Sequence, residues 1–461
     1  MGETAPLTFE VNDKLGLKPF SEKLEIFLIV EHDFVEGSLV VSLSAPFGAG
    51  KTTFLSMWKS DLDKRRASDS AIPKVIKVNA WESDYSGDPL LSIVNGLIKS
   101  VSTDESATES KDAGKLREAA KDVGWFATGL ANKLVSNWTG LDPAEAGKFA
   151  EEKKQNRKPK IPDFVSLYDE RSKALEKLKA TLQEVFGGES PKAFVFVDEL
   201  DRCRPDYAIS YLETIKHVFD VHGLVFVLAV DYDQLESSAK SLFGENLKFS
   251  DYFRKFSQRT ITLPEPNESN LQMLAYSYVK CYLEKEGKRT SLLNANEARI
   301  RDIVNFVVAL KMPPRQIQEM FRIIGHMLIA VDPKQRGQIY WCIGVATILM
   351  SALKVAEPRM YRLIGRAEAT HLEIGKFLVK LLGKKTADCW FCVYITGADG
   401  RDLDEATDLE KLFREIGLIE NDAPFNRQNT LGQFAQGWGH GWTTQSWWKT
   451  IYEKIEAANT I

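Results

Sequence analysis

The stretch of sequence that decides the fold is "VSLSAPFGAGKTTFLSMW", residues Val41–Trp58. An apolar run precedes a glycine-containing loop, and a helix-forming run follows it. The loop matches G-x-x-x-x-G-K-[ST], the pattern of loops that wrap a phosphate, except that Ala45 stands at the first glycine position. In such loops, successive backbone N–H groups point inward, and the next helix presents its positive N-terminus to the anion. The stretch therefore predicts a strand, a phosphate-binding loop and a helix.

Two side chains of this loop carry the chemistry that a nucleotide requires. Lys51 is expected to reach the β- and γ-phosphates, and the Thr52 hydroxyl is expected to hold Mg²⁺. Gly48 and Gly50 permit the positive φ angles of such a loop. Ala45 would cost about 1 kcal/mol only if its position requires a left-handed backbone. The predicted nucleotide-binding residues form one continuous segment: Ala45, Pro46, Phe47, Gly48, Ala49, Gly50, Lys51, Thr52 and Thr53.

A second motif, "KAFVFVDELDRC" at residues 192–203, places acidic groups at the end of another apolar strand. Asp198 is placed to hold Mg²⁺ through its water shell. Glu199 follows at once and is placed to orient or deprotonate the attacking water. The strand "GLVFVLAVD" ends in Asp231, where a polar group could sense the γ-phosphate. An Asp-Glu pair after a strand can also cap a helix, but two motifs in the required order favour a nucleotide site.

Short apolar runs alternate with helical patterns through the first half of the chain, which is typical of an α/β fold. The runs "KAFVFVDE" and "GLVFVLAVD" are almost entirely apolar, as central parallel strands covered on both faces should be. A further strand, "KVIKVNAW", lies in sequence between the two motifs. Its placement in the sheet between the loop strand and the acidic strand would mark the hydrolytic division of P-loop proteins.

The predicted fold class is α/β: a P-loop NTPase three-layer αβα core with a parallel sheet and a helical insertion, followed by a helical lid and a helical C-terminal domain. Polar and then basic sequence, ending in "EEKKQNRKPKIP", indicates the insertion. After "TLPEPN", apolar residues recur at helical spacing. The expected domains are residues 1–268 for the NTPase with its insertion at about 101–160, residues 269–330 for the lid, and residues 331–461 for the C-terminal domain.

The composition, 44% hydrophobic and 27% charged residues, is that of an ordinary globular protein. A formal net charge of −4 does not indicate nucleic acid as a partner, although it leaves room for a local basic patch. Five scattered cysteines and the absence of a signal-like N-terminus favour a cytoplasmic location. We expect no membrane insertion, because the apolar run at 123–141 contains Lys133 and the run at 338–353 is too short to span a bilayer.

Five segments, in order, resemble the KAP family of P-loop NTPases. The most diagnostic is the Asp-Asp/Glu-Leu-Asp-Arg-Cys block at Asp198–Cys203, and Asn79–Trp81 match the family's Asn-Ala-Trp strand end. Ala45 and Phe47 stand where members typically have Gly and Trp. The resemblance covers about residues 15–325 and rests on "SAPFGAGKTTFL", "KVNAWESDYSGDPLL", "FVFVDELDRCRPDYAISYLETIKHVF", "LVFVLAVDYDQLESSA" and "DYFRKFSQRTITLPEP".

This resemblance implies ATP and Mg²⁺ as cofactors and arginines that act from outside the pocket. Arg254 and Arg259 lie where a ring-forming ATPase can offer an arginine to the γ-phosphate held by a neighbouring copy. Arg315 begins a predicted lid helix and resembles a second sensor of nucleotide state. Each arginine could otherwise form a surface salt bridge. The chain resembles the soluble members of the family, which are associated with bacterial defence against phage.

Three functions are consistent with these residues. The first is an ATP-hydrolysing homo-oligomer whose turnover drives assembly or remodelling of a protein partner. The second is a nucleotide-dependent switch or scaffold with little turnover. The third is a kinase acting on a small molecule or a nucleic-acid end, for which no acceptor-binding motif is visible. The aromatic-rich end "FAQGWGHGWTTQSWWKTIYEKI" could be core or a partner surface, and aromatic clusters are usually core.

Overall fold

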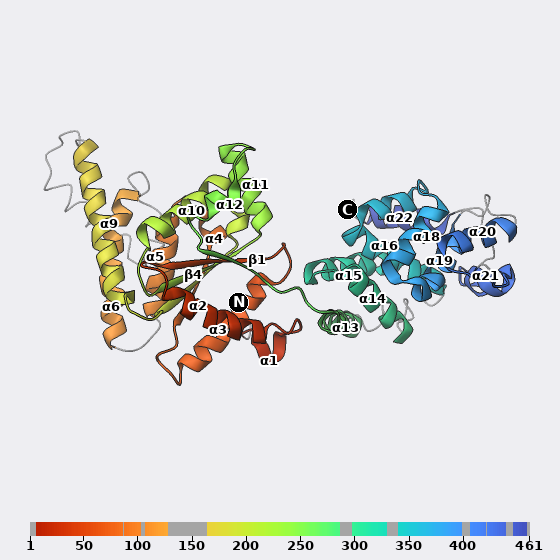
Figure 1. Cartoon of the computed structure of the whole chain (residues 1–461), viewed down its shortest axis with the longest axis horizontal. Helices are drawn as coiled ribbons and strands as arrows, with labels where there is room; N and C mark the ends of the chain where they lie inside the picture. The colour runs from red at the N-terminus through yellow and green to blue at the C-terminus, as the bar shows by residue number, and fades with distance from the viewer. Residues whose placement is uncertain are drawn as a thin grey trace. The chain divides into compact units, whose positions relative to one another are not determined.

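The computed structural model of the chain divides into two compact units, each described here by itself (Figure 1). The first unit comprises Met1–Asp13 and Leu17–Glu265, and the second comprises Lys14–Gly16 and Pro266–Ile461. The predicted domain boundaries at residues 268 and 330 stay predictions. The structure describes residues 6–85, 87–102, 107–127, 164–285, 297–329, 340–398, 406–420, 422–438 and 446–458.

A five-stranded sheet forms the middle layer of the first unit, in the order β2-β3-β4-β1-β5. Every neighbouring pair of strands is parallel. This arrangement confirms the predicted α/β core with a parallel sheet. The strands are β1 (Leu39–Ser44), β2 (Lys74–Asn79), β3 (Ala193–Asp198), β4 (Leu224–Val230) and β5 (Arg259–Thr262).

The strand that separates the loop strand β1 from the acidic strand β3 is β4, so the expectation that "KVIKVNAW" fills this place was wrong. That segment is β2 and lies at the sheet edge beside β3. The reason is visible in the side chains. Every residue of β4 is buried, as an interior strand requires, whereas Lys74 and Lys77 of β2 are only partly buried and suit an edge.

Alternate side chains of the sheet enter two separate apolar layers. On one face, Phe194 and Phe196 of β3 pack against Trp58, with ring centroids 6.1 and 4.9 Å from the indole. The intervening Val195 and Val197 belong to the core on the other face, which contains residues of α5 and α10. This period of two is what a pleated sheet covered on both faces requires, and it confirms the three-layer architecture (Figure 1).

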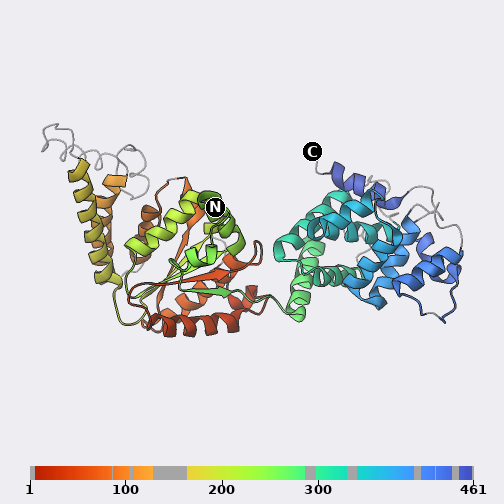
Figure 2. The same cartoon turned by 45° about the horizontal axis from the view of Figure 1, so that its top comes forward.

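Helices of the first unit cover both faces of this sheet, and α6 and α9 form a pair at its side (Figure 2). This pair packs through Leu116, Leu178 and Leu182, all fully buried. Residues 128–160 of the predicted insertion, with the basic run at 151–162, lie outside the described residues. The helices are α1 (Phe9–Asn12), α2 (Lys18–His32), α3 (Lys51–Arg66), α4 (Ala80–Asp84), α5 (Pro89–Ser102), α6 (Ala107–Ala127), α9 (Phe164–Phe186), the 3₁₀ turn η1 (Leu200–Arg202), α10 (Pro205–Val218), α11 (Tyr232–Phe243) and α12 (Phe249–Phe253).

The second unit is helical throughout its described residues, as predicted from the apolar spacing. Residues 341–353 of its apolar run at 338–353 form most of a buried helix, α16. Trp438 and Trp448 from the aromatic-rich end are each 1% exposed and lie in the core. The helices are α13 (Glu268–Lys285), α14 (Glu297–Ala309), α15 (Pro314–Ile329), α16 (Trp341–Ala356), α17 (Pro358–Gly365), α18 (His371–Leu382), α19 (Lys384–Gly397), α20 (Ala406–Ile416), α21 (Arg427–Gln436) and α22 (Trp447–Ala457).

Helices in the described parts of the chain are all too short or too polar to cross a lipid bilayer.

Candidate nucleotide-binding site

The loop between β1 and α3 has the backbone that a phosphate-binding loop requires. Gly48 and Gly50 adopt positive φ angles of 83° and 98°, which residues with a side chain rarely adopt. Lys51 is the first residue of α3, so the helix N-terminus points its free N–H groups back into the loop. The nine predicted nucleotide-binding residues therefore form the loop and the first turn of α3.

Ala45 does not have the left-handed backbone conformation that would strain an alanine at this position. The described non-glycine residues with positive φ are Glu199, Lys311 and Ala367, and Ala45 is not among them. Its N–H donates to the Val230 carbonyl of β4 at 3.2 Å, which extends the sheet pairing by one residue. The cost of about 1 kcal/mol for a left-handed alanine therefore does not apply here.

Lys51 is buried beneath the loop and is held by the loop itself. Its Nζ donates to the Ala45 carbonyl at 2.5 Å and to the Pro46 carbonyl at 3.4 Å. Asp201 Oδ2 lies 3.8 Å from the same Nζ. Burial lowers the pKa of Lys51, and the carboxylates of Asp201, Asp231 and Asp198 oppose that shift. The site thus holds a desolvated cation where an anionic ligand would compensate it.

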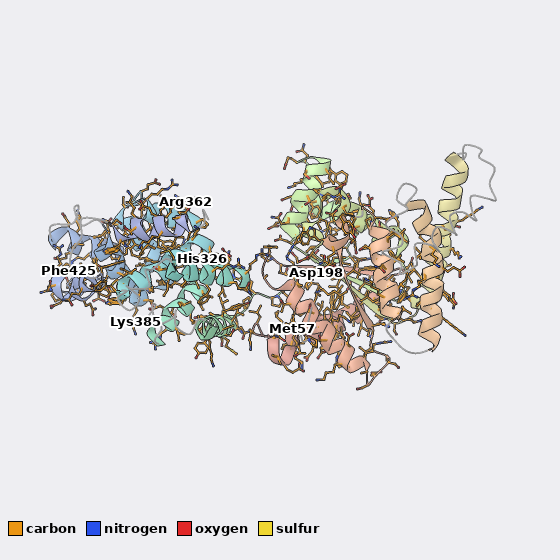
Figure 3. The ribbon with its side chains drawn as sticks, turned by 180° about the vertical axis from the view of Figure 1, so that it is seen from behind. Met57, Asp198, His326, Arg362, Lys385 and Phe425 are labelled. Atoms are coloured by element: carbon orange, nitrogen blue, oxygen red, sulfur yellow. The ribbon has the colours of Figure 1, made fainter. Side chains whose placement is uncertain are left out.

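Asp198 ends β3 inside the first unit, where it is 3% exposed (Figure 3). The Thr52 hydroxyl donates to Asp198 Oδ1 at 3.2 Å, so the structure brings together the two residues predicted to hold Mg²⁺. Lys77 Nζ of β2 lies 3.3 Å from Asp198 Oδ2. The sequence did not point to Lys77, because its approach to Asp198 depends on β2 pairing with β3.

Glu199 takes a left-handed backbone, with φ 62° and ψ 25°, directly after the strand. Such a conformation is costly for glutamate and is typical of functional sites. Its Oε2 accepts from Asn79 Nδ2 at 3.1 Å, and its Oε1 pairs with Arg202 Nη2 at 3.0 Å. The side chain is 16% exposed. Asn79 reaches Glu199 because Asn79 and Asp198 are register partners at the ends of β2 and β3.

Asp231 and Asp201 join the end of β4 to the loop. Asp231 Oδ2 accepts from the Phe47 N–H at 2.9 Å, and its own N–H donates to Asp201 Oδ2 at 2.9 Å. Burial raises the pKa of Asp201, while Lys51 opposes the shift. The carboxylate of Asp231 thus lies beside the phosphate-binding loop, and its role in sensing the γ-phosphate stays a prediction.

Within the first unit, Arg254 and Arg259 form ion pairs with residues outside this loop. Arg259 begins β5 and pairs with Glu31 of α2 at 2.7 Å, on a side chain that is 58% exposed. Arg254 follows α12, where its side chain is 79% exposed and lies 3.9 Å from Asp251. Arg315 belongs to α15 of the second unit. Their predicted roles toward a neighbouring copy or a bound nucleotide stay predictions.

The phosphate-binding loop, the acidic strand and the strand order together define a nucleotide-binding P-loop NTPase domain. The model of the KAP family P-loop domain matches residues 18–329. This chain therefore belongs to the KAP family of P-loop NTPases, as its five segments indicated.

The solved structures that match this chain include two of the Aeropyrum Pernix ORC2 protein. Its ADP form is 11% identical with a TM-score of 0.34, covering 96% of this chain and 94% of that chain. Its ADPNP-ADP complexes are 12% identical with a TM-score of 0.35, covering 97% and 95%. Likeness at this level assigns no function. No curated protein matches the chain.

Proposed function

We propose that this chain is an Mg²⁺-dependent ATPase whose turnover drives the assembly or remodelling of a protein partner. The observation that carries the proposal is the 3.2 Å hydrogen bond from the Thr52 hydroxyl to Asp198 Oδ1. This contact brings the phosphate-binding loop and the acidic strand to one edge of the sheet, beside Glu199. Hydrolysis requires these three elements together: a phosphate cradle, metal-binding oxygens and a carboxylate that can orient water.

The residues present fit Mg²⁺ and a triphosphate. A hydroxyl and a carboxylate, from Thr52 and Asp198, are the oxygen ligands that Mg²⁺ prefers. When bound, the ion neutralises charge on the phosphate oxygens. Lys51 would balance the same charge from inside the loop, and the N–H groups at the start of α3 would bind the phosphates. Lys77 at 3.3 Å would share the Asp198 carboxylate with the ion.

Oligomerisation is part of this proposal and is supported by the exposure of two arginines. Arg254 and Arg259 present their side chains at the surface, where a neighbouring copy can contact them. Arg315 is proposed as a sensor in the second unit. A cytoplasmic location is supported by the five cysteines, none of which is in a disulfide, and a role in antiviral defence rests on the family resemblance alone.

A nucleotide-dependent switch with little turnover is the second candidate, and one observation favours it. Lys51, Asp198 and Glu199 are each already engaged by partners from the chain itself: Ala45, Lys77 and Asn79, respectively. A bound nucleotide that shifts these contacts would change the conformation of the site, and that change itself can be the output.

Phosphate release from ATP, and separately from GTP, tests the first proposal and sets the nucleotide preference. Lys51→Ala is expected to abolish nucleotide binding, because it removes the charge that faces the phosphates. Glu199→Gln is expected to keep ATP binding and to lower turnover by about 100–1,000-fold, since it keeps the shape but loses the carboxylate. Binding is measured with a fluorescent ATP analogue, and turnover by release of inorganic phosphate.

Two matched variants control for general damage. Lys59→Ala removes a partly exposed lysine two turns along α3, and Glu213→Gln changes an exposed glutamate of α10. Both should behave as the unchanged chain. Tight ATP binding without phosphate release, together with an ATP-induced change in assembly, would establish the switch instead. Unaltered binding by Lys51→Ala would refute the phosphate-binding loop.

A further inference from the structure

Arg202 lies between two aromatic rings at the rim of the nucleotide site. Its guanidinium carbon is 5.0 Å from the centre of the Phe47 ring and 5.8 Å from that of the Trp81 ring. Both rings are about half exposed, at 45% and 52%, although large aromatic side chains are usually more buried. A guanidinium over an aromatic face is attracted electrostatically by the ring. The two rings therefore restrict where Arg202 can place its charge.

The same guanidinium binds the carboxylate proposed to orient the attacking water. Arg202 Nη2 is 3.0 Å from Glu199 Oε1, while Asn79 Nδ2 donates to Glu199 Oε2 at 3.1 Å. Each carboxylate oxygen thus has one anchor, and the anchors come from different elements, η1 and the end of β2. Because each oxygen keeps a second lone pair, the carboxylate can still accept from water while its orientation is fixed.

These contacts connect the phosphate-binding loop to Glu199. Phe47 lies in the loop between Pro46 and Gly48, and its N–H is bound to Asp231 Oδ2. A bound phosphate that moves this part of the loop also moves the ring against which Arg202 rests. We infer that Arg202, held by Phe47 and Trp81, is a positioning residue: it fixes the orientation of Glu199 and transmits loop occupancy to it. This inference rests on the proposed ATP hydrolysis.

An ordinary surface ion pair would not have these properties. Arg202 and Glu199 are three residues apart, and exposed pairs at that spacing contribute little to stability. Arg322 and Glu319 form such a pair on α15, at 2.6 Å and on side chains that are 69% and 46% exposed. That pair is a matched control because it has the same two residue types at the same spacing, in the other unit.

The first experiment measures kcat and KM for ATP, with the affinity for ADP measured separately. Arg202→Ala is expected to lower kcat about 10–100-fold and to leave ADP affinity within about twofold, because a misplaced catalytic group costs rate rather than binding. Trp81→Leu should lower kcat by a smaller factor in the same direction. The double variant should be no slower than Arg202→Ala, since Trp81 acts only through Arg202. Arg322→Ala should change none of these values.

Arg202→Lys separates the effect of losing the planar guanidinium from the effect of losing its positive charge. Lysine keeps the charge but has no planar face to lie between two rings, so it should recover little of the lost rate. Recovery of the full rate by lysine would overturn the role of the aromatic pair. Additive losses in the double variant, or an unchanged kcat in Arg202→Ala, would overturn the inference itself.

A second readout separates this inference from the proposed function. Hydrogen exchange of a peptide covering residues 199–203 should accelerate in Arg202→Ala and in Trp81→Leu, and not in Arg322→Ala. In the unchanged chain, ADP should alter exchange of that peptide, and Phe47→Leu should weaken the effect. A chain without phosphate release refutes the ATPase, yet these exchange changes would still establish the link from loop to Glu199. Exchange that none of these changes affects would refute the link.

Discussion

The two units bury different kinds of side chain. Among the described residues, the buried carboxylates and the buried lysine all belong to the first unit: Asp84, Asp198 and Lys51. In the second unit, the buried polar residues are the hydroxyls Thr347, Ser351 and Thr396. Charge is costly to bury unless it is paired, whereas the Thr347 and Thr396 hydroxyls donate to carbonyls of their own helices. The second unit is thus built for stability, and the first holds groups whose burial favours a ligand.

Shifts in pKa at the carboxyl edge of the sheet support this contrast. Burial lowers the pKa of Lys51 and raises that of Asp201, so each charged form is disfavoured despite their separation of only 3.8 Å. The buried carboxylate of Asp84, by contrast, accepts two hydrogen bonds from Arg204. The backbone N–H of Arg204 donates at 3.1 Å and its Nε donates at 3.0 Å. Arg204 compensates Asp84 within the chain through two short hydrogen bonds, whereas Asp201, 3.8 Å away, compensates Lys51 only in part, and a phosphate would complete that compensation.

The largest expected effect tests the apolar core of the second unit. Trp448 is 1% exposed, and its Nε1 donates to the Tyr394 carbonyl at 2.9 Å. Trp448→Ala should lower the free energy of unfolding by about 3–5 kcal/mol, because it leaves a cavity and removes a buried hydrogen bond to the Tyr394 carbonyl. Urea denaturation followed by circular dichroism measures the loss. ADP affinity should stay unchanged at temperatures where both units are folded.

Phe34→Ala controls for the loss of an aromatic ring, since Phe34 is 80% exposed. Its expected effect on the free energy of unfolding is within about 0.5 kcal/mol. A Trp448→Ala variant as stable as the Phe34→Ala variant would contradict the assignment of stability to the second unit's core.

Next in size is the expected effect of the metal-binding hydroxyl in the first unit. Thr52→Ala should weaken Mg²⁺-dependent nucleotide binding by about 10–100-fold, a typical loss when a metal site is altered. Its effect on the free energy of unfolding should be small, because residue Thr52 is exposed apart from its contact with Asp198. Titration of an ATP analogue with and without Mg²⁺ measures the change.

Thr181→Ala is the control, since Thr181 is a half-buried helix residue outside the site whose hydroxyl donates to the Lys177 carbonyl. If Mg²⁺ raises the ATP affinity of the Thr52→Ala variant as much as it raises that of the parent chain, Thr52 is not part of the metal site. The contrast between the units would then rest on Lys51 alone.

Sequence patterns predicted the strands and the loop because both depend on local order. Apolar runs identify β3 and β4, and the spacing of Gly48, Gly50 and Lys51 identifies the phosphate-binding loop. The order of strands was not predictable in the same way, and β2 was expected in the place that β4 occupies. A run of apolar residues says that a strand is buried but does not say which strands lie beside it.

Two of the residues missed in the site depend on that order. Asn79 and Lys77 reach Glu199 and Asp198 only because β2 pairs with β3. The packing of Arg202 against Phe47 and Trp81 joins three segments that are far apart in sequence. One local signal did exist: the family block includes Arg202 itself, three residues after Glu199, a spacing at which side chains meet on a helical turn.

The first unit also buries a histidine, at a distance from the phosphate-binding loop. The pH dependence of the free energy of unfolding therefore tests whether this unit buries ionisable groups. His32 is fully buried at the end of α2, where Nε2 accepts from the Gly223 N–H at 3.1 Å and the ring stacks on His222 at 4.2 Å. Burial, and then the charge of His222, lowers the pKa of His32 below 6.5. The unfolded chain therefore binds more protons below pH 6.5, so the free energy of unfolding should fall as the pH falls below that value.

His32→Gln should reduce this pH dependence, because glutamine stays neutral. Urea midpoints measured above and below pH 6.5 give the slope for each variant. His217→Gln, a change at an exposed position of α10, should keep the parent slope. Equal slopes for the parent and the His32→Gln variant would show that burial of this histidine has no part in the acid sensitivity of the first unit.

The smallest expected effect is at Ala45, where the phosphate-loop pattern has glycine. Since Ala45 has an ordinary φ and its N–H is bound to the Val230 carbonyl, glycine would relieve no strain. Ala45→Gly should lower the free energy of unfolding by about 0.4–1 kcal/mol through the added freedom of the unfolded chain, and ATP affinity should not improve. Ala71→Gly, at an exposed position, separates this entropic term from the loss of a buried methyl group. A stabilised Ala45→Gly variant would mean that the loop does need a left-handed residue there, and that the first unit stores strain as well as charge beside its ligand.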